Sequence, residues 1–424
     1  MDYVPRIIDD ELDQLLTGIG AIAIDGPKAV GKTVTATRRA ATIFRLDDPI
    51  QREVMAADAT RLVAGEPPIL IDEWQRLPES WDLVRRAVDA DPMAGRFLLT
   101  GSATPLSAPT HSGAGRIVSV RMRPMTLSER GVGAPSVSLA ELLTGHHPAI
   151  SGSTDVGLEA YVDEIVASGF PGLRHLKDRQ LRAQLDGYIE RILEHDFVEL
   201  GGYVVRNPQA LRGWLTAYAA ATSTTASYET IRDASAPDQA KKPARTTTQP
   251  YRDVLQRLWI VEPIPAWLPS LNRFSRLVAP PKHQLADPAL AARLLGVGAD
   301  ALLEGRGTDV PIPREGSLLG DLFEALVTLG VRTFAQAAEA SVRHLRTKGG
   351  EHEVDLILER GDGRVVAIEV KLGRGTNDAD VRHLRWLRDQ LGDGLLDAVV
   401  ITTGPEAYRR QDGIAIVPAA LLGP

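Results

Sequence analysis

The chain contains no cysteine, which excludes disulfides, cysteine zinc sites, iron–sulfur clusters and thiol catalysis. It has no run of about 18 apolar residues, so we expect no transmembrane helix. Its first residues are acidic and amphipathic rather than a basic and then apolar leader, and we expect a cytoplasmic protein. An excess of positive charge is also absent, since 48 Lys and Arg face 55 Asp and Glu. A generally basic nucleic-acid coat is therefore excluded, although a local basic face is not.

The length of the chain allows several folded domains. Its 424 residues correspond to about three domains at roughly 150 residues each, and 44% of them are hydrophobic, so each domain can bury a core. In the first third, short apolar runs alternate with helical patterns. The runs Ala21–Ile24, Ile69–Ile71 and Phe97–Leu99 each end at polar residues. This alternation predicts a parallel sheet with crossover helices.

A glycine-rich loop follows the first of these strands and opens a helix predicted over Thr33–Ala41. The loop consists of Gly26, Pro27, Lys28, Ala29, Val30, Gly31, Lys32 and Thr33. Glycines let the backbone wrap phosphates, and N–H groups at a helix start bind them. Lys32 is expected to neutralise the β- and γ-phosphates and Thr33 to ligate Mg²⁺. The loop therefore predicts ATP and Mg²⁺ as cofactors.

Two further strands end in residues that suit hydrolysis of the nucleotide. Asp72 and Glu73 follow the strand at 69–71; Asp72 is expected to hold Mg²⁺ through water and Glu73 to orient or activate the attacking water. The pair also suits the start of a helix, predicted at 74–88, and both roles are compatible. Ser102 follows the strand at 96–99 and is a candidate sensor of the γ-phosphate, with a simple turn as the alternative.

These motifs carry a resemblance to a known family. Residues 19–130 resemble the AAA-superfamily ATPase domain of bacterial and archaeal ATP-binding proteins that have a C-terminal DUF4143 region. The matching N-terminal segments are Gly26–Thr33, Leu46–Pro49, Ile71–Gln75, Leu99–Ser102, Gly115–Arg116 and Pro124–Glu129. The looser C-terminal matches are Tyr251–Val261, Pro281–Asp287, Gly320–Val327, Glu353–Leu356 and Glu369–Lys371. The resemblance implies an ATPase and covers most of the chain.

Three arginines that follow the candidate sensor Ser102 suggest that several copies of the chain assemble into an oligomer. Arg116, Arg121 and Arg123 are the candidates, and Arg116, which follows Gly115, fits the family pattern best. In AAA ATPases an arginine of a neighbouring subunit can stabilise the transferring phosphoryl group. A finger role would imply a homo-oligomer, with a hexamer among the options. The alternatives are a structural ion pair or a solvated strand, and a monomeric nucleotide switch.

Helical patterns at 208–221, 228–234 and up to Ile260 suggest a helix-turn-helix, in a winged form. Basic residues accompany them: Lys241, Lys242, Arg245, Arg252, Arg257, Arg273, Arg276 and Lys282. A recognition helix with flanking basic residues suits contact with the DNA backbone. We therefore expect binding of branched or single-stranded DNA with low sequence specificity. A protein–protein module is the alternative.

Carboxylates gather in the last segment. Glu324 lies on a predicted helix, and a hairpin centred on Asp362 places Asp355 opposite Glu369, about 5 Å apart. Carboxylates that close repel one another unless a divalent cation lies between them. Lys371 shares the face of Glu369.

This arrangement resembles the restriction-endonuclease-like fold, in its archaeal Holliday-junction-resolvase branch. The resemblance implies a metal held by Glu324, Asp355 and Glu369, with Lys371 supporting the nucleophile. The alternatives are a salt-bridged hairpin with Glu353 opposite Lys371, and a retained fold without activity. In a purely structural site, loss of Asp355 would relieve repulsion and leave stability equal or higher.

Together these patterns predict an α/β protein with four parts: an AAA-type P-loop ATPase at 1–135, a linker and helical lid at 136–204, a winged-helix-like module at 205–280, and a restriction-endonuclease-like α/β domain at 281–424 with its core at 316–424. The expected function is Mg-ATP hydrolysis coupled to work on branched or broken DNA. The alternative is a nucleotide switch that binds a protein partner and carries an inactive nuclease-like domain.

Overall fold

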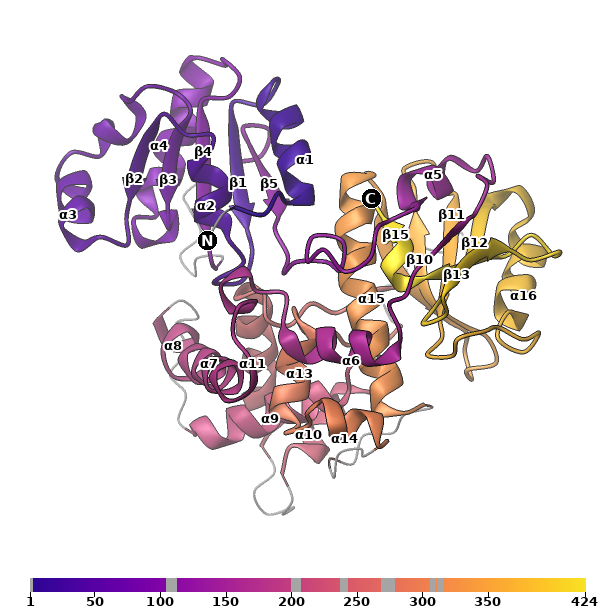
Figure 1. Ribbon diagram of the computed structural model, residues 1–424. Helices are drawn as coiled ribbons and strands as arrows, with labels where there is room; N and C mark the ends of the chain where they lie inside the picture. The colour runs from indigo at the N-terminus through magenta and orange to yellow at the C-terminus, as the bar shows by residue number, and fades with distance from the viewer. Residues whose placement is uncertain are drawn as a thin grey trace.

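The computed structural model describes residues 3–103, 113–199, 207–236, 243–267, 279–305, 310 and 316–424. Figure 1 shows three regions: an N-terminal α/β region, a helical region below it, and a C-terminal α/β region beside the long helix α15 (Leu318–Ala337). Within the described ranges, no helix combines the length and apolar character needed to cross a membrane.

The N-terminal region is built on a five-stranded parallel sheet in the order β2-β3-β4-β1-β5. Its strands are β1 Ala21–Asp25, β2 Thr42–Arg45, β3 Ile69–Asp72, β4 Phe97–Gly101 and β5 Ile117–Arg121. Alternate residues face opposite sides, so Leu70 and Leu98 join one core while Ile71 and Leu99 join another. The predicted parallel sheet is confirmed.

Helices cover both faces of this sheet: α1 Ile7–Leu16, α2 Lys32–Thr37, α3 Pro49–Ala57 and α4 Glu79–Ala90, with the 3-10 helices η1 Ala59–Val63 and η2 Trp74–Arg76. Two predicted helices are shorter than expected. The helix after the phosphate loop ends at Thr37, because the chain must turn into β2. The helix predicted at 74–88 is divided into η2 and α4 at Pro78, whose ring disfavours a helical residue before it.

The helical region packs its helices around one apolar core. They are α6 Leu158–Ala167, η3 Pro171–Leu173, α7 Asp178–Arg191, the π-helical turn η4 Ile192–Asp196, α8 Phe197–Glu199, α9 Pro208–Ala220, α10 Tyr228–Ala234, α11 Arg245–Arg257, α13 Pro288–Leu294 and α14 Ala299–Leu303. α13 packs on α6, α7 and α9, α14 packs on α6, and both also contact α15. Residues 281–305, which we expected to belong to the C-terminal domain, therefore pack on the helical region as well as on α15.

The segment predicted to form a winged helix-turn-helix lies within this region. The helices α9, α10 and α11 pack together, and the chain after α11 forms two antiparallel bridges, Val261 with Leu285 and Ile264 with Lys282. α11 begins at Arg245 and continues through Pro250.

The C-terminal region holds an eight-stranded mixed sheet in the order β7-β13-β14-β12-β11-β10-β9-β8. Its elements follow α15 as β9 Ser341–Arg346, β10 Glu353–Glu359, β11 Val365–Val370, α16 Arg382–Leu391, η6 Gly392–Gly394, β12 Leu395–Thr402, β13 Glu406–Arg409, β14 Ala415–Pro418, η7 Ala419–Leu421 and β15 Leu422–Gly423. Earlier parts of the chain supply its edges: β7 (Gly152–Ser153) pairs with β13, and β8 (Ala266–Trp267) with β9.

The segment expected to be a linker after residue 136 belongs to this C-terminal region. β6 (Val137–Ser138) pairs with β15, and α5 (Leu139–Thr144) lies among the C-terminal strands in Figure 1. α5 buries Leu139, Leu142 and Leu143, because its apolar side chains face α15 and the sheet. α5 ends at Gly145, whose φ of 78° turns the chain out of the helix.

Candidate functional site

The phosphate loop connects the end of β1 to the start of α2, as predicted. A Cβ atom at Gly26 would lie 2.3 Å from the carbonyl oxygen of Met122, so this position requires glycine. Gly31 has φ of 104° and directs the chain into the helix. The loop therefore has the close backbone approach and the left-handed turn that phosphate binding needs.

Lys32 lies beneath the loop. Its side chain is buried, and Nζ lies 2.8 Å from the carbonyl oxygens of both Gly26 and Pro27. Burial lowers the pKa of this ammonium to about 8, against the opposing attraction of Glu73. A buried ammonium bound to the loop itself fits a role in compensating phosphate charge.

The two residues predicted to hold Mg²⁺ are in contact. Thr33 Oγ1 donates a hydrogen bond to Asp72 Oδ1 at 2.7 Å, and the Thr100 hydroxyl donates to the same oxygen. Hydroxyl and carboxylate oxygens are the hard ligands that Mg²⁺ prefers. The donor set of Thr33 and Asp72 therefore fits this cation at the carboxyl ends of β1 and β3.

Glu73 is held beside them in a left-handed conformation with φ of 55°. Ser102 Oγ lies 3.1 Å from Glu73 Oε2, and Gln75 Nε2 donates to both Glu73 and Ser102. Ser102 directly follows β4, which lies between β1 and β3 in the sheet. It therefore stands between the strand that leads into the phosphate loop and the strand that ends at Asp72, as predicted. Gln75 was not singled out as a site residue, although its place two residues after Glu73 was a usable signal.

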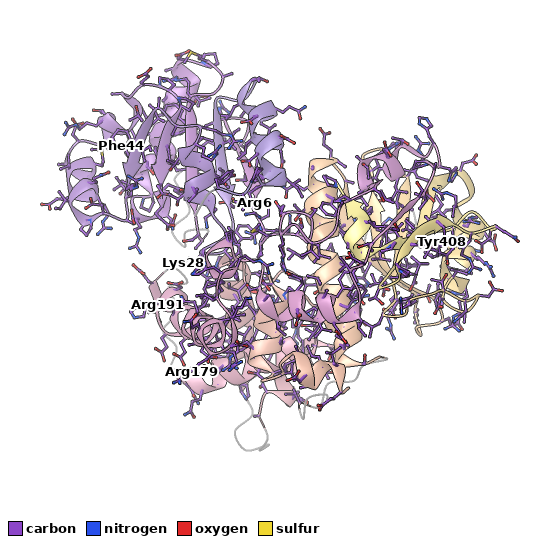
Figure 2. All side chains as sticks on the ribbon, viewed as in Figure 1. Arg6, Lys28, Phe44, Arg179, Arg191 and Tyr408 are labelled. Carbon is purple, nitrogen blue, oxygen red and sulfur yellow. The ribbon has the colours of Figure 1, made fainter. Side chains whose placement is uncertain are left out.

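A second residue of the loop faces the helical region. Lys28 Nζ pairs with Asp196 Oδ1 at 2.6 Å, and Tyr188 OH donates to the Lys28 carbonyl oxygen at 3.1 Å. Figure 2 shows Lys28 where the N-terminal and helical regions meet. Sequence reasoning did not find this contact, because Asp196 is distant in the chain and lies in a π-helical turn.

The candidate arginine fingers have separate positions. Arg116 pairs with Asp89 at 2.7 Å, and 47% of its side chain is exposed. It precedes β5, whose first residue is level with the start of β1, so it lies at the opposite edge of the sheet from its own phosphate loop. Arg123 instead pairs with Glu262 at 2.7 Å, and Arg121 stacks on Trp259 at 3.8 Å. Those two arginines are engaged within the chain.

The basic residues predicted to contact DNA differ in burial and in their contacts. Lys282 is 1% exposed and is therefore not a DNA-contacting residue. Arg252 pairs with Asp253 at 3.0 Å and stacks on Tyr228. Arg245 is exposed at the start of α11. Four other candidates lie outside the described residues: Lys241, Lys242, Arg273 and Arg276.

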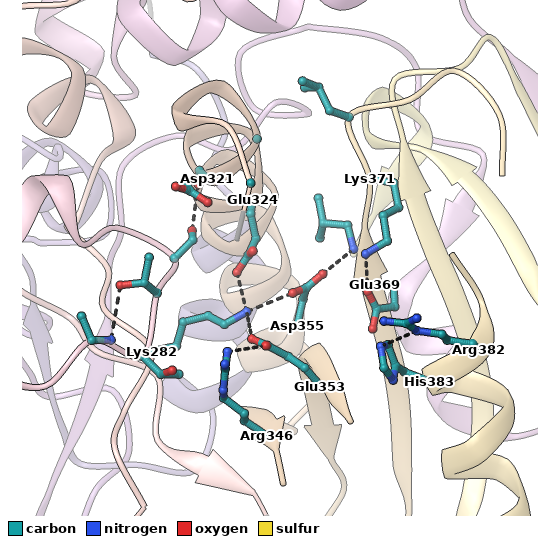
Figure 3. A pocket seen from close by; sticks show the side chains of 18 of the residues that line it. Lys282, Asp321, Glu324, Arg346, Glu353, Asp355, Glu369, Lys371, Arg382 and His383 are labelled. Carbon is teal, nitrogen blue, oxygen red and sulfur yellow. Dashed lines mark hydrogen bonds and ion pairs between the residues drawn. The ribbon is translucent and has the colours of Figure 1, made fainter. Parts of the chain in front are cut away.

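A cavity of about 520 Å³ lies between residues 223–230, α15 and the strands β10 and β11. Figure 3 shows Lys282 reaching into its acidic lining. Lys282 Nζ lies 2.9 Å from Glu324 Oε1, 3.0 Å from Asp355 Oδ1 and 3.8 Å from Glu353 Oε1. On the other side, Lys371 Nζ pairs with Glu369 Oε2 at 2.6 Å.

The predicted hairpin register is confirmed, since Leu356 pairs with Ile368 and one further step places Asp355 opposite Glu369. The predicted metal trio is not assembled: in the part of the chain described by the structure, no three His, Asp or Glu side chains form a group that could hold a metal. Lys282 takes the place between Glu324 and Asp355, and the sequence contained no signal for it.

Protonation differs among these carboxylates. Burial raises the pKa of Asp355, but the charge of Lys282 outweighs it and holds that pKa at about 2. Burial raises the pKa of Glu369 to about 8, reinforced by the charge of Asp355. The cluster thus keeps one carboxylate ionised and favours a proton on another.

Comparisons with known proteins agree with this division of the chain. An AAA domain family matches residues 19–130, and the family of unknown function DUF4143 matches residues 319–422. A second family of unknown function, DUF8612, matches residues 158–301, which correspond to the helical region.

Uncharacterized proteins of Mycobacterium tuberculosis and Mycobacterium bovis are each 26% identical over 408 residues, covering 94% of this chain and 80% of theirs. Among solved structures, a Walker-type ATPase of Pyrococcus abyssi matches with a TM-score of 0.39 and 15% identity, over 69% of this chain and 96% of that one. The RuvB Holliday junction branch migration motor of Thermotoga maritima matches with a TM-score of 0.26 and 16% identity, over 64% and 93%.

Proposed function

We propose that this chain, in which an AAA domain family matches residues 19–130 and DUF4143 matches residues 319–422, hydrolyses Mg-ATP to drive or gate the binding or processing of branched or broken DNA. The observation that carries the proposal is the convergence of Lys32, Thr33, Asp72 and Glu73 at one edge of the parallel sheet. These are the parts that phosphoryl transfer to water requires.

Each residue has a separate task at this site. Lys32 compensates phosphate charge, and the oxygens of Thr33 and Asp72 hold the cation. Bound Mg²⁺ supplies neutralisation of the charge that develops on the transferred phosphoryl group. Glu73 orients the attacking water, and Ser102 and Gln75 fix the position of its carboxylate.

The link between the phosphate loop and the helical region supports coupling to a second task. Lys28 bonds to Asp196, and the chain downstream of Asp196 leads into the winged arrangement of α9, α10 and α11. A conformational change of the phosphate loop on nucleotide binding would therefore be transmitted through this ion pair to the module that we propose contacts DNA. Exposed Arg245, together with Lys241, Lys242, Arg273 and Arg276, would provide a local basic face with little sequence preference.

Assembly into a homo-oligomer, with a hexamer as one option, is part of the proposal. Arg116 is exposed and lies far from its own phosphate loop, as an arginine acting on a neighbouring subunit must.

ATPase assays across single-stranded, branched and duplex DNA at two salt concentrations test the proposal. We expect stimulation that weakens at high salt, because phosphate contacts release counterions, and a loss of turnover in Lys32→Ala as the control. Equal turnover with and without every DNA form would contradict the DNA role and leave the ATPase intact.

A second candidate is a nucleotide switch that binds a protein partner and has an inactive nuclease-like domain. The position of Lys282 between Glu324 and Asp355 favours it, because an ammonium stands where a catalytic metal would be needed. ATPase activity indifferent to DNA, together with a partner whose binding depends on ATP, would support this alternative.

A further inference from the structure

A buried arginine just before α1 contacts the phosphate loop. The side chain of Arg6 is 4% exposed, and its Nη1 atom donates a hydrogen bond of 2.9 Å to the backbone carbonyl oxygen of Val30. Figure 2 shows Arg6 at the side of the N-terminal region that faces the rest of the chain. Val30 directly precedes Gly31 and Lys32, so the bond acts on the peptide group that connects Val30 to Gly31.

The other nitrogen atoms of the Arg6 guanidinium are held outside the loop. Nε pairs with Glu129 Oε1 at 2.9 Å, and Nη2 donates to the Arg123 carbonyl oxygen at 2.7 Å. Glu129 is itself fixed, because its carboxylate oxygens accept hydrogen bonds from the backbone N–H groups of Ile7 and Thr126. A guanidinium is planar and rigid. The nitrogen that contacts the loop is therefore fixed in direction by the other two.

The bond to Val30 sets the direction of the next backbone N–H group. In a planar trans peptide the C=O and N–H bonds point in opposite directions. Because Arg6 holds the Val30 carbonyl oxygen on its own side of the loop, the Gly31 N–H is directed to the other side. A Cβ atom at Gly31 would lie within 3.9 Å of Arg6, Met122 and Pro171. Protein thus fills the Arg6 side, and phosphates must approach from the side to which the N–H points.

The glycine at position 31 makes this constraint necessary. Gly31 adopts φ of 104°, and without a Cβ atom its φ is free to take either sign. Sterics therefore do not prevent the Val30–Gly31 peptide from reversing. A reversed peptide would turn the Val30 carbonyl oxygen towards the phosphates, where it would repel them. A hydrogen bond from a charged donor opposes that reversal.

We propose that Arg6 is a positioning residue for ATP binding, which fixes the Val30–Gly31 peptide so that the Gly31 N–H donates to a phosphate oxygen. Arg6 acts through the backbone and touches no phosphate itself. The inference rests on the proposed binding of ATP at this loop, but it requires neither hydrolysis nor DNA.

Binding of a fluorescent ATP analogue to Arg6→Lys tests the proposal. Lysine keeps a charge for Glu129 but lacks the fork that reaches Val30 and Arg123 together. We expect Kd to rise by roughly tenfold or more, as for the loss of a hydrogen bond from a charged group. In steady-state hydrolysis KM for ATP should rise by the same factor while kcat falls less, because the Gly31 N–H contacts phosphate before and during the reaction.

Arg130→Lys is the matched control. The Arg130 side chain is fully buried and donates to the carbonyl oxygens of Met125 and Glu164 and to the Glu164 carboxylate. It therefore has the same kinds of acceptor as Arg6, and all of these lie outside the phosphate loop. Both lysine variants should lower the melting temperature, but only Arg6→Lys should raise Kd, measured well below both melting temperatures.

Wild-type affinity in Arg6→Lys, or an equal loss of affinity in Arg130→Lys, would overturn the proposal. If Arg6→Lys does not fold, Arg6→Leu/Glu129→Gln removes the donor together with the charge that would be left buried and unpaired. That variant should bind the analogue as weakly as expected for Arg6→Lys, and wild-type affinity in it would also overturn the proposal.

The same measurements separate this inference from the proposed function. A wild-type protein that binds the analogue without hydrolysing ATP would contradict the proposed function and leave the comparison of Kd values intact. A wild-type protein that hydrolyses ATP, with unchanged Kd and KM in Arg6→Lys, would contradict only the role of Arg6. Failure of the wild type to bind the analogue would overturn both.

Discussion

Lys28 of the phosphate loop and Asp196 of the helical region form an ion pair of 2.6 Å. The carboxylate is almost fully buried, with 5% of its side chain exposed, whereas 34% of the Lys28 side chain is exposed, so solvent and salt screen the pair only in part. The backbone carbonyl oxygen of Lys28 also accepts a hydrogen bond from the Tyr188 hydroxyl. The loop that is expected to bind phosphates is therefore tied to a second region by two contacts.

Asp196→Asn should tighten ATP binding, because the freed Lys28 ammonium adds positive charge next to the phosphates. A gain of about 1 kcal/mol corresponds to roughly fivefold in Kd, measurable with a fluorescent ATP analogue. Glu199→Gln is the matched control, since Glu199 also joins the two regions through Arg76 at 2.9 Å but is more exposed. Equal Kd values for both variants and wild type would show that the pair does not influence the nucleotide.

Glu73→Gln should retain ATP binding and lose most turnover, because only the carboxylate that orients water is removed. Ser102→Ala should slow turnover less, by about tenfold, since Gln75 still holds Glu73. Single-turnover hydrolysis and nucleotide binding separate the two steps. A Glu73→Gln protein that turns over at the wild-type rate would refute the assignment.

ATP affinity should fall as pH rises above about 8. Burial lowers the pKa of Lys32 to about 8, so the nucleotide-free protein increasingly carries a neutral amine above that pH, whereas bound phosphates require the ammonium. One unit above the pKa, the loss approaches roughly tenfold. The free energy of unfolding of the nucleotide-free protein changes in the opposite direction. The Lys32 amine keeps its proton up to a pH of about 10.4 in the unfolded chain, so the folded protein becomes more stable as pH rises from about 8 to about 10.4. A flat affinity profile from pH 7 to 9 would contradict this environment.

Asp355→Asn should destabilise the protein by about 3 kcal/mol, because it breaks a buried pair with Lys282 and weakens the bond from Val370 N–H. The expectation from carboxylate repulsion alone, that stability stays equal or rises, has the opposite sign. Since the folded pKa of Asp355 is about 2, its contribution is present above about 4 and is lost as pH falls towards 2. Thermal unfolding measures this, with exposed Asp389→Asn as the control.

Arg116→Ala should bind ATP normally and hydrolyse it poorly if Arg116 acts on a neighbouring subunit. Mixing it with Lys32→Ala should restore part of the activity, because one subunit supplies the finger and the other the pocket. Arg85→Ala is the matched control, since Arg85 shares the partner Asp89. Turnover per subunit that is independent of protein concentration, from a species that sediments as a monomer, would rule out the trans role.

Local patterns predicted the parts of the molecule that depend on neighbours in sequence. The phosphate loop, the strand that ends at Asp72, the strand that precedes Ser102, and the hairpin that sets Asp355 opposite Glu369 all follow from periodicity and turn chemistry. The contacts of Lys282 and Lys28 could not be predicted, because each joins regions that are brought together only by tertiary packing. The extent of the C-terminal region was missed for the same reason: its edge strands come from residues 152–153 and 266–267.

The pairing of β6 with β15 also has a consequence for synthesis of the chain on the ribosome. Residues 137–153 emerge soon after the ATPase region, yet their partners in β13 and β15 emerge only with residues 406–423. The ATPase sheet can close early, whereas α5 and its flanking strands wait until the rest of the polypeptide has been made. A fragment that begins at residue 316 would lack β6 and also β7 and β8, and without the last two both edges of its eight-stranded sheet would be open to other chains.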